Sequence, residues 1–481
     1  MVNLLSTFIL WFNYGVLIYY GIANGVYIFL LIIAAGVIVQ HLLRLSYGKY
    51  QESIHSSISL PVSVLIAAYN EESNIAESLK SLLLLNYPSY EIIVINDGST
   101  DSTLNRLIDG FNLQQIDLVY RPIIKTSAVK GFFTNPDIPN LTVVDKIHGG
   151  KSDALNVGIN ISRSPYFCSV DADSILEKDA LLRLMRPILE TSEMVKATGG
   201  IVRLINGSTI KDGAIVKVSL PKDSLSMFQI VEYIRSFLFG RAGWSAINSL
   251  LIISGTFSMF HKKTIQAIGG YSLKTVTEDM ELVVNLHRYL IDNKQRYHIA
   301  FIPDPICWTE APQTLNTLAK QRQRWHVGLA ESIWQHRSMI FNPKYGRIGI
   351  FALPYQFFIE LIGPVIEVAG YFVVTVSLII GLIDMQFFML FLTMAIAIGV
   401  FLSTGAILLE EITFKRYPKM TDICKLLLYG VLENFGYRQL NALWRVKALV
   451  KILFARRKWE YIKKHGFKSI HKNISELEKT P

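Results

Sequence analysis

Charged residues and cysteines are scarce in this sequence. Only 18% of the 481 residues are charged and 51% are hydrophobic, a balance typical of a membrane protein rather than of a soluble enzyme. The three cysteines, Cys168, Cys307 and Cys424, lie far apart and form no CxxC or Cys/His pattern. Their spacing therefore argues against a disulfide framework and against a zinc site.

Two long segments are almost free of charge. Residues 5–43 contain no Asp, Glu, Lys or Arg, and residues 361–408 contain only two acidic residues. The first segment is about twice as long as a signal-peptide core and lacks a basic start, so residues 1–50 are predicted to be a retained anchor of one or two helices. A second membrane region is predicted over 346–455. Its strong segments lie near 349–382 and 386–410, and a weaker one near 422–453 is either interfacial or a re-entrant pair.

Positive charge is concentrated beside the apolar segments. The net charge is +10, and lysines and arginines cluster near residues 44–49, 412–420 and 444–464. Cations that flank membrane segments mark the cytoplasmic side, and no basic patch is interleaved with aromatic residues, so the charge indicates a membrane surface and no nucleic acid. We therefore expect a multi-pass protein of the cell membrane with a cytoplasmic central domain. A basic cytoplasmic tail over 456–481 requires an even number of crossings after that domain.

Residues 58–340 are predicted to form an α/β domain. Short β-branched runs alternate with amphipathic helices there, which predicts a mostly parallel sheet covered on both faces. A stretch rich in Gly, Lys and Ser, residues 203–248, interrupts the alternation and is expected to be an insertion that packs at the membrane interface. The predicted strands are Val62–Ala68, Glu91–Asn96, Thr142–Val144 and Tyr166–Val170, and the predicted helices are Ile75–Leu85, Ser152–Ile161 and Ala180–Leu189.

Acidic residues directly follow several of the predicted strands. Tyr69 and Glu71 follow the first strand, Asp97 the second, and Asp171 and Asp173 the fourth. Ligands of open α/β sheets lie at the carboxyl ends of the strands, so these residues form one predicted site. Each motif alone also fits a plain turn, and their shared location is the argument for function. Two carboxylates two residues apart suit Mg²⁺ or Mn²⁺, hard cations that prefer oxygen ligands and neutralise a diphosphate.

Three further motifs supply groups that such a site needs. Asp279 is predicted near the N-terminus of a helix, which favours the ionised carboxylate of a general base, and a plain N-cap is the alternative. Gln321, Arg324 and Trp325 lie in a helical segment, where Arg grips phosphate and Trp stacks on a sugar ring; a solvated basic helix is the alternative. Lys151, at a strand-to-helix junction, is either a nucleotide contact or a surface lysine.

Seven short motifs occur in a characteristic order. They are Ala-Ala-Tyr-Asn-Glu at 67–71, Asn-Asp-Gly-Ser at 96–99, Gly-Lys-Ser-Asp-Ala-Leu-Asn at 150–156, Asp-Ala-Asp at 171–173, Ser-Gly-Thr-Phe at 254–257, Thr-Glu-Asp at 277–279 and Gln-Arg-Gln-Arg-Trp at 321–325. This set resembles glycosyltransferase family 2, in particular its membrane-bound processive branch, which includes poly-N-acetylglucosamine, hyaluronan, chitin and cellulose synthases. The resemblance covers residues 60–330 and implies a GT-A catalytic domain, a Rossmann-like nucleotide-sugar-binding fold, flanked by transmembrane helices.

The resemblance also implies a role for each motif. Nucleotide-sugar binding is implied for Tyr69, Glu71, Asp97, Lys151 and Asp171, binding of Mg²⁺ or Mn²⁺ for Asp171 and Asp173, the catalytic base for Asp279, acceptor or diphosphate binding for Gln321, Arg324, Trp325 and Glu278, and the acceptor-site lining for Ser254–Phe257. The implied reaction is inverting transfer from a UDP-sugar, UDP-GlcNAc or UDP-Glc, to a growing β-linked polysaccharide that the protein helps to export. Its partners would be that donor, the carbohydrate acceptor and the lipid bilayer, with room for an accessory membrane subunit.

Two other functions stay open at this point. A non-processive transferase that loads one sugar onto a lipid carrier shares the fold, although the Gln-Arg-Gln-Arg-Trp motif at 321–325 favours polymerisation. A transporter without catalysis needs no pair of carboxylates at a sheet edge and has denser polar residues inside the membrane. The donor sugar, the linkage and the polymer length are not determined by these motifs.

Overall fold

The computed structural model describes residues 2–47, 60–191, 194–382, 384–417 and 419–454. They form two compact units, each assembled from separate stretches of the chain. The helical unit comprises residues 2–40, 223–246 and 312–454, and the sheet unit comprises residues 41–47, 60–222 and 247–311. The predicted basic tail, residues 456–481, lies outside the described residues, and the predicted domain boundaries stay predictions.

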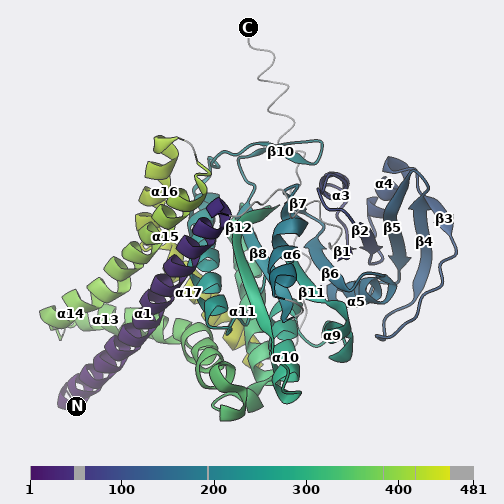
Figure 1. Cartoon of the computed structure of the whole chain (residues 1–481). Coiled ribbons are helices and arrows are strands. Elements are labelled where there is room, and N and C mark those ends of the chain that lie inside the picture. Colours follow the sequence, from purple (N-terminus) through teal and green to yellow (C-terminus); the bar gives the residue numbers. More distant parts are fainter. Residues whose placement is uncertain (1, 48–59, 192–193, 383, 418, 455–481) are drawn as a thin grey trace, which may run out of the picture. The chain divides into compact units, whose positions relative to one another are not determined.

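In the described part of the chain, one ten-stranded sheet forms the centre of the sheet unit (Figure 1). Its middle consists of parallel strands in the order β5-β2-β1-β6. Successive side chains of a strand point to opposite faces, so the uninterrupted burial of Val62–Ile66 shows that both faces are covered. These strands are β1 (Val62–Ala68), β2 (Tyr90–Asn96), β5 (Ile138–Lys146) and β6 (Tyr166–Asp171).

Mostly antiparallel pairs extend the parallel centre on both sides, so the prediction of a mostly parallel sheet is wrong for the flanks except for the parallel pair of β8 and β12. On one side β4 pairs with β5 and β3 with β4; on the other, β11 joins β6 to β8, and β12 lies between β8 and β7. The β4–β5 hairpin turns at Pro136 and Asp137, where the Asp137 N–H donates to the Asn135 side chain at 2.8 Å. Hairpins need no intervening helix, so a strand–helix alternation does not predict them. The flanking strands are β3 (Gln114–Ile116), β4 (Val129–Asn135), β7 (Ser174–Leu176), β8 (Val195–Leu204), β11 (Phe257–His261) and β12 (His298–Thr309).

The helices of the sheet unit include the predicted amphipathic segments. Helix α5 is buried along nearly its whole length and contacts β1 and β2, whereas α6 contacts β8 and β12. Leu181, Leu184 and Ile188 of α6 are three and four residues apart and all buried, as one apolar helix face requires. The helices are α3 (Ile75–Leu83), α4 (Thr103–Gly110), α5 (Lys151–Ile161), α6 (Ala180–Glu190), α9 (Lys262–Ala267) and α10 (Glu278–Asp292).

The predicted insertion at 203–248 divides between the two units. Its first part forms a small hairpin whose Ile210 packs with Ile175, Ile205 and Trp308 of the sheet unit. Its second part is helical and belongs to the helical unit. The elements are β9 (Thr209–Lys211), β10 (Ala214–Lys217), α7 (Ser224–Arg235), the π-helical turn Ser236–Arg241 and α8 (Ala242–Ala246).

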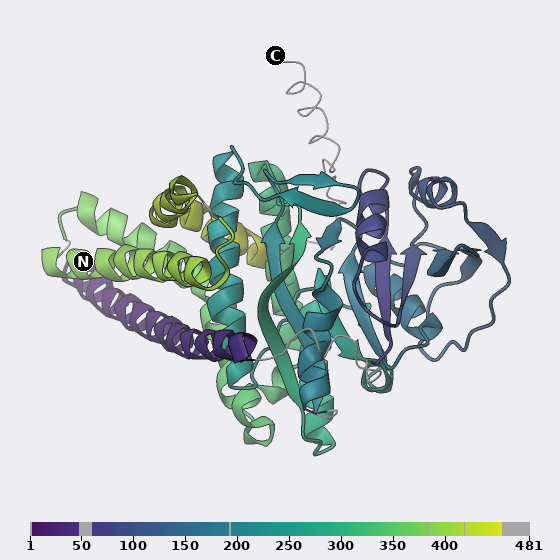
Figure 2. The ribbon, with the colours of Figure 1, turned by 45° about the horizontal axis from the view of Figure 1, so that its top comes forward.

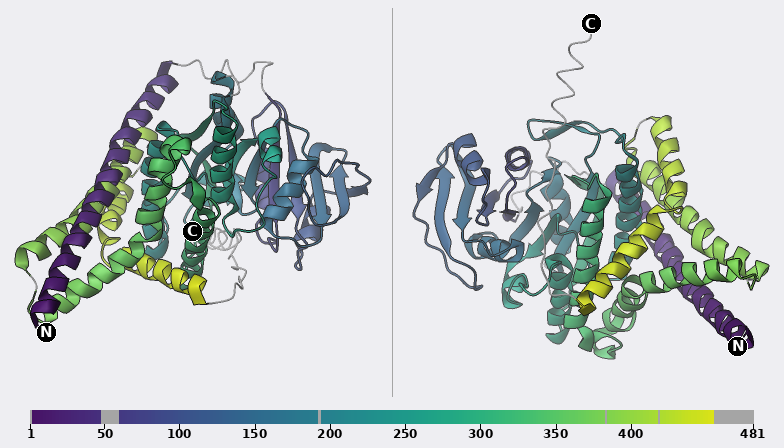
Figure 3. Two further views of the ribbon diagram at one scale, coloured as in Figure 1. Left: turned by 90° about the horizontal axis from the view of Figure 1, so that it is seen from below. Right: turned by 180° about the vertical axis from the view of Figure 1, so that it is seen from behind.

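One continuous helix, α1 (Val2–Tyr47), covers most of the predicted N-terminal anchor, where one or two helices were expected. In the helical unit, Val16 and Tyr20 of α1 pack with Val374 and Phe391. The Asn24 side chain also donates to the Met394 carbonyl at 3.0 Å. Figures 2 and 3 show α1 beside the helices of the C-terminal region. These are α13 (Gly363–Ile379), α14 (Met385–Leu392) and α15 (Ile398–Phe414).

Three helices among the described residues are long and apolar enough to cross a membrane. They are Ile9–His41, Ile348–Ile379 and Met385–Phe414, with 33, 32 and 30 residues. They coincide with the predicted anchor and with the two strong C-terminal segments. Two of them follow the sheet unit in the chain, and the predicted number of membrane crossings stays a prediction.

The weaker segment predicted near 422–453 folds as two helices, α16 (Met420–Leu432) and α17 (Tyr437–Phe454). Between them lies the fully buried Glu433, which forms an ion pair with Arg235 of α7 and accepts a hydrogen bond of 2.5 Å from the Ser403 hydroxyl. A buried carboxylate needs such partners, because leaving it unpaired is costly. Hydropathy does not measure such polar contacts, so the segment near 422–453 has a weaker apolar signal than the two segments before it.

Strand β8 leaves no room for a side chain at Gly199, where a Cβ atom would lie 2.0 Å from Cγ2 of Ile253. We expect Gly199→Ala to destabilise the protein by about 1–3 kcal/mol, because the buried, β-branched Ile253 side chain has to shift. The measurement is the midpoint of thermal unfolding of the detergent-solubilised chain. Gly131→Ala on β4 is the control, since its nearest atom, at 3.3 Å, ends the flexible Gln115 side chain. Equal midpoints for the two variants would contradict this packing.

Candidate active site

The carboxyl ends of β1, β2, β5 and β6 meet at one edge of the sheet. The chain order reverses beside β1, because β2 and β5 lie on one side of it and β6 lies on the other. Ligands of open α/β sheets bind at such a switch point. The structure brings to this edge the predicted residues Tyr69, Glu71, Asp97, Lys151, Asp171 and Asp173.

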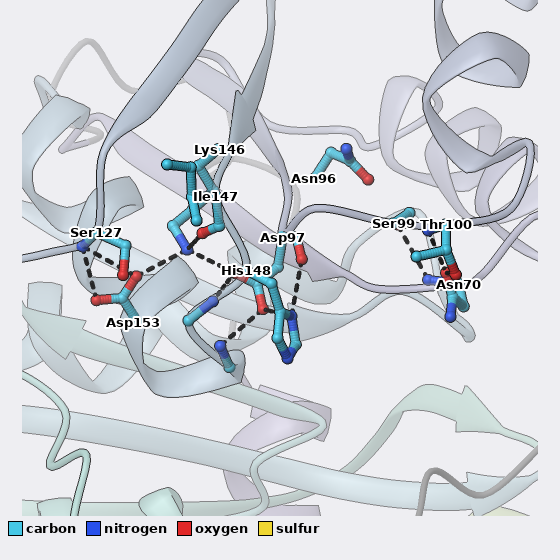
Figure 4. Close-up of polar contacts among 12 residues, drawn as sticks. Asn70, Asn96, Asp97, Ser99, Thr100, Ser127, Lys146, Ile147, His148 and Asp153 are labelled. Atoms are coloured by element: carbon cyan, nitrogen blue, oxygen red, sulfur yellow. Dashed lines mark hydrogen bonds and ion pairs between the residues drawn. The ribbon is translucent and has the colours of Figure 1, made fainter.

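Asp97 is the centre of a hydrogen-bond network at this edge (Figure 4). Its carboxylate is 2% exposed and accepts from the backbone N–H groups of Gly149 at 2.9 Å and Gly150 at 2.8 Å. Lys146 Nζ lies 2.5 Å from Asp97 Oδ1, and His148 Nδ1 lies 2.9 Å from Oδ2. Lys146 is the last residue of β5, and the other three residues lie in the turn between β5 and α5, so Asp97 fixes the path of the chain into that helix.

Lys146 is fully buried between two carboxylates. Its Nζ is 2.5 Å from Asp97 Oδ1 and 2.7 Å from Asp153 Oδ2, and it also donates to the Ile147 carbonyl at 2.6 Å. The Asp153 carboxylate in turn accepts from the Ser127 N–H at 3.1 Å. Sequence reasoning missed Lys146, since a lysine at the end of a strand is usually at the surface.

The turn after β1 is tied to the turn after β2. Asn70 has a left-handed backbone with φ of 55°, a conformation that Asn tolerates. Its side-chain oxygen accepts from the Thr100 N–H at 2.8 Å, and its own N–H donates to the Ser99 hydroxyl at 3.0 Å (Figure 4). The Glu71 N–H donates to the Thr103 hydroxyl at 2.9 Å. The two motifs at 67–71 and 96–99 therefore hold each other in place.

Tyr69 and His148 form an aromatic pair at the same edge. Their ring centroids are 4.4 Å apart and their planes are tilted by 34°. The His148 side chain is 55% exposed, so one part of the ring faces solvent. His148 was not among the predicted site residues; its signal in the sequence is its position directly before the Gly149-Gly150-Lys151 motif.

Lys151 begins α5 and links two acidic motifs. Its Nζ is 2.7 Å from Asp171 Oδ1 and 2.8 Å from Glu278 Oε1, and it lies 3.4 Å from the Gly255 carbonyl. Burial by itself lowers the pKa of Lys151, but the carboxylates of Asp171 and Glu278 outweigh it and hold the pKa well above its usual value. Lys151 therefore carries a fixed positive charge beside the end of β6 at neutral pH.

Asp279 follows Glu278 in the first turn of α10. Its Oδ2 accepts from the Gly255 N–H at 3.0 Å, and its Oδ1 accepts from the Met280 N–H at 2.9 Å. These donors and the helix N-terminus stabilise a negative charge on the carboxylate. A Cβ atom at Gly255 would lie 3.1 Å from Asp279 Oδ2, so the close approach of the motif at 254–257 depends on glycine.

Asp171 and Asp173 supply two carboxylates at the end of β6. Asp173 is buried, and its Oδ2 lies 3.5 Å from the Thr309 hydroxyl. The described residues contain no group of three or more His, Cys, Asp or Glu side chains that could hold a metal ion. A cation that takes one or two carboxylates and completes its shell with phosphate oxygens and water, as Mg²⁺ does, fits this donor set.

The predicted acceptor residues Gln321, Arg324 and Trp325 lie on α11 (Leu315–Gln335) in the helical unit. The Trp325 side chain is 37% exposed, and the Arg322 guanidinium lies 4.4 Å from its ring centroid. Arg322, which sequence reasoning did not single out, is buried and pairs with Glu232 at 2.9 Å. The structure thus shows how the Trp325 ring is held, and the roles of Gln321, Arg324 and Trp325 stay predictions.

The site combines a carboxylate pair, a fixed cation and an acidic helix start at the edge of an α/β sheet where the parallel strands end. Residues 60–328 match the family described as "Glycosyltransferase like family 2". This match covers more than half of the chain, and the chain belongs to that family. The predicted family, its enzyme class of glycosyltransferases and the α/β GT-A fold class are thereby confirmed.

Known proteins with similar sequences include polysaccharide synthases. The chain is 29% identical over 267 residues to poly-beta-1,6-N-acetyl-D-glucosamine synthase of Staphylococcus epidermidis, covering 56% of this chain and 54% of that protein. It is 32% identical over 299 residues to the probable glycosyltransferase YdaM of Bacillus subtilis, covering 62% and 61%. The chain thus spans between half and two thirds of the length of these curated relatives.

One similar solved structure is the mannosyltransferase PcManGT from Pyrobaculum calidifontis in complex with GDP-Man and Mn²⁺. Its sequence identity to this chain is 16% and the TM-score is 0.45. The similarity covers 90% of this chain and 99% of that one.

Replacing Lys146 by methionine tests the buried network. Lys146→Met keeps the size of the side chain but leaves Asp97 and Asp153 without their shared cation. We therefore expect the free energy of unfolding to fall by about 3–5 kcal/mol. Lys130→Met is the matched control, because Lys130 is half exposed and its ammonium group lies 3.6 Å from the Asp145 carboxylate. The free energy of unfolding of this variant should fall by less than about 1 kcal/mol. Unfolding midpoints in denaturant compare the two. An equal change in both variants would show that Lys146 is not the cation that holds the network.

Proposed function

We propose that this chain is a membrane-embedded inverting glycosyltransferase. It transfers a sugar from a UDP-sugar, with UDP-GlcNAc as the first candidate and UDP-Glc as the second, to a growing β-linked polysaccharide that it helps to export. The observation that carries the proposal is the ammonium group of Lys151, which joins Asp171 at 2.7 Å to Glu278 at 2.8 Å. This contact links the strand-end carboxylates to the helix that bears Asp279.

The donor assignment rests on charge and on the relatives. A nucleoside diphosphate is a leaving group with several negative charges, and Lys151 supplies a fixed positive charge where such a group binds in open α/β sheets. The Staphylococcus epidermidis relative is named for N-acetylglucosamine and for a polymer of it. UDP-GlcNAc and polymerisation are therefore the first candidates for this chain.

A divalent cation is the proposed cofactor. Asp171 and Asp173 would hold Mg²⁺ or Mn²⁺ together with phosphate oxygens of the donor. When bound, the cation neutralises charge that develops on the diphosphate. Lys151 contributes to the same neutralisation without any metal.

The transfer step needs a base for the acceptor hydroxyl. The hydroxyl oxygen attacks C1 of the donor sugar from the face opposite the diphosphate, and a new C1–O bond forms with inversion. The bond between C1 and the diphosphate oxygen breaks, and its electron pair leaves with UDP. The hydroxyl proton passes to the Asp279 carboxylate, which the Gly255 N–H orients at 3.0 Å.

The acceptor sugar is assigned to the exposed face of Trp325. An indole ring offers a flat apolar surface on which a pyranose ring stacks, and Arg322 holds this ring from one side at 4.4 Å. Gln321 and Arg324 would bind the acceptor or the diphosphate. An accessory membrane subunit stays a prediction.

A panel of donors tests the function. The purified full-length chain is incubated in detergent with UDP-GlcNAc, UDP-Glc, other UDP-sugars and GDP-mannose, with Mg²⁺, with Mn²⁺ or with EDTA, and UDP release and product size are measured. We expect one UDP-sugar to be used, EDTA to stop turnover, and a polymer to form. A product of one sugar on a lipid would favour the lipid-loading alternative. The absence of turnover with every UDP-sugar would overturn the proposal.

Asp279→Asn tests the base within the same assay. The amide keeps the shape of the side chain but does not take up a proton, so we expect transfer to fall by about two to four orders of magnitude while UDP affinity stays near normal. The control is Asp292→Asn at the other end of α10, where the carboxylate lies 3.8 Å from Arg288 and away from the strand ends. Loss of UDP binding in Asp279→Asn would assign Asp279 to the donor site instead.

The proposed location is the cell membrane, with the sheet unit in the cytoplasm. Support comes from the three helices that are long and apolar enough to span a bilayer, two of which follow the sheet unit. The basic clusters near 412–420 and 444–464 would then face the same side as the sheet unit. Residues 455–464 of the second cluster lie outside the described residues.

Cys424 tests this topology. It is exposed on α16, whereas Cys168 and Cys307 are buried, so a maleimide should label Cys424 selectively. A membrane-impermeant maleimide should miss Cys424 in intact cells and label it after permeabilisation. Val119→Cys in a Cys424→Ser background is the control, since Val119 is fully exposed in the sheet unit and should behave in the same way. Labelling of one site but not the other in intact cells would contradict a shared cytoplasmic side.

A further inference from the structure

His148 contacts two residues of the predicted nucleotide site, and no step of the proposed transfer uses it. Its ring centroid is 4.4 Å from that of Tyr69. Its Nδ1 is 2.9 Å from the backbone oxygen of Asp97 and 2.9 Å from Oδ2 of the same residue (Figure 4). The side chain is still 55% exposed, so a ligand has access to the rest of the ring.

The partners of His148 determine which ring nitrogen carries the hydrogen. A backbone carbonyl and an ionised carboxylate accept hydrogen bonds and do not donate them, so Nδ1 is the donor. In the neutral imidazole, Nε2 then has a lone pair and acts as an acceptor. Within the described part of the chain, the polar contacts of this ring run through Nδ1, which leaves Nε2 to a ligand.

Protein donors occupy most of the acceptor capacity of the Asp97 carboxylate, which has about four lone-pair positions. Oδ1 accepts from Lys146 and the Gly149 N–H, Oδ2 accepts from the Gly150 N–H, and His148 Nδ1 lies 2.9 Å from Oδ2. With 2% of its surface exposed, Asp97 is a positioning residue that acts on a ligand through His148.

The groups suited to a diphosphate lie on the other side of β1. Asp171 and Asp173 follow β6, and Lys151 bonds to Asp171, whereas His148 follows β5. A nucleoside diphosphate placed across this edge therefore directs its phosphates toward β6 and its base toward β5. The exposed part of the His148 ring is then the polar group that meets the base.

We propose that His148 recognises the uracil of the donor by accepting a hydrogen bond at Nε2 from uracil N3–H. The inference rests on the proposed function, because it takes the donor to be a UDP-sugar. Uracil presents a donor at N3 and cytosine presents an acceptor there, so the lone pair on Nε2 selects uridine over cytidine nucleotides. Thymine has the same N3–H group and is not distinguished by this contact.

Binding of UDP, N3-methyl-UDP and CDP to the full-length chain in detergent, measured by calorimetry, tests the contact. N3-methyl-UDP lacks the N3–H donor. We expect wild-type protein to bind UDP roughly tenfold more tightly than either analogue, the size of one hydrogen bond. In His148→Phe, which keeps a ring beside Tyr69 but has no acceptor, the preference for UDP should fall to roughly twofold or less. His148→Gln, whose side-chain oxygen accepts, should regain part of it.

His261→Phe is the matched control. His261 pairs with Tyr166 at the start of β6, on the opposite edge of the sheet, and should keep the roughly tenfold preference. An unchanged preference in His148→Phe overturns the role of His148 and leaves the proposed function standing, whereas a wild-type preference for CDP overturns both. Failure of the wild-type chain to bind any uridine nucleotide overturns both. If His148→Phe does not fold, equal discrimination by His148→Ala, which has no acceptor, and wild type overturns the role of His148.

Discussion

The burial of one ammonium group, that of Lys146, is the constraint on which this edge of the sheet depends. A charge removed from water costs several kcal/mol unless it is paired, and Lys146 has no exposed surface. Its two carboxylate partners come from the end of β2 and from the first turn of α5. Neutralising Lys146 therefore draws β2, β5 and α5 together, and the turn that carries His148 and Lys151 takes its shape from that requirement.

The parallel centre of the sheet could be predicted from the sequence, and its flanks could not. The apolar run Val62–Ala68 has the bounds of β1, because a strand buried on both faces reads as one continuous apolar segment. Strands such as β4 and β11 pair by hairpin or by long-range contacts, and their sequences mix polar and apolar residues. Likewise, hydropathy registered Glu433 as a weakness of a membrane segment, whereas its partners on α7 and α15 make it a buried contact between helices.

The residues of the candidate site also divide into those that the sequence predicts and those that it does not. Residues directly after strands, such as Asp97 and Asp171, could be placed together because topology alone brings strand ends to one edge. Lys146, His148 and Arg322 could not, because each gains its importance from partners distant in the sequence, up to 90 residues away for the Arg322–Glu232 pair. Sequence patterns thus located the candidate site, and the side-chain network around it became visible only in three dimensions.

The length of α1 has a consequence for the lipid around it. At 1.5 Å per residue, the 33 residues Ile9–His41 extend about 50 Å, whereas the hydrocarbon core of a bilayer is about 30 Å thick. Such a hydrophobic mismatch is relieved by tilt, by local thickening of the bilayer or by protein that covers the surplus. Buried residues such as Val16, Tyr20, Leu30 and Ala34 recur along α1, whereas Ile18 and Ile32 are exposed, so protein covers one face of the helix and leaves an apolar face open in both halves. In the proposed membrane location, that open face is longer than the hydrocarbon core, and tilt of the helix or local thickening of the bilayer would accommodate the difference.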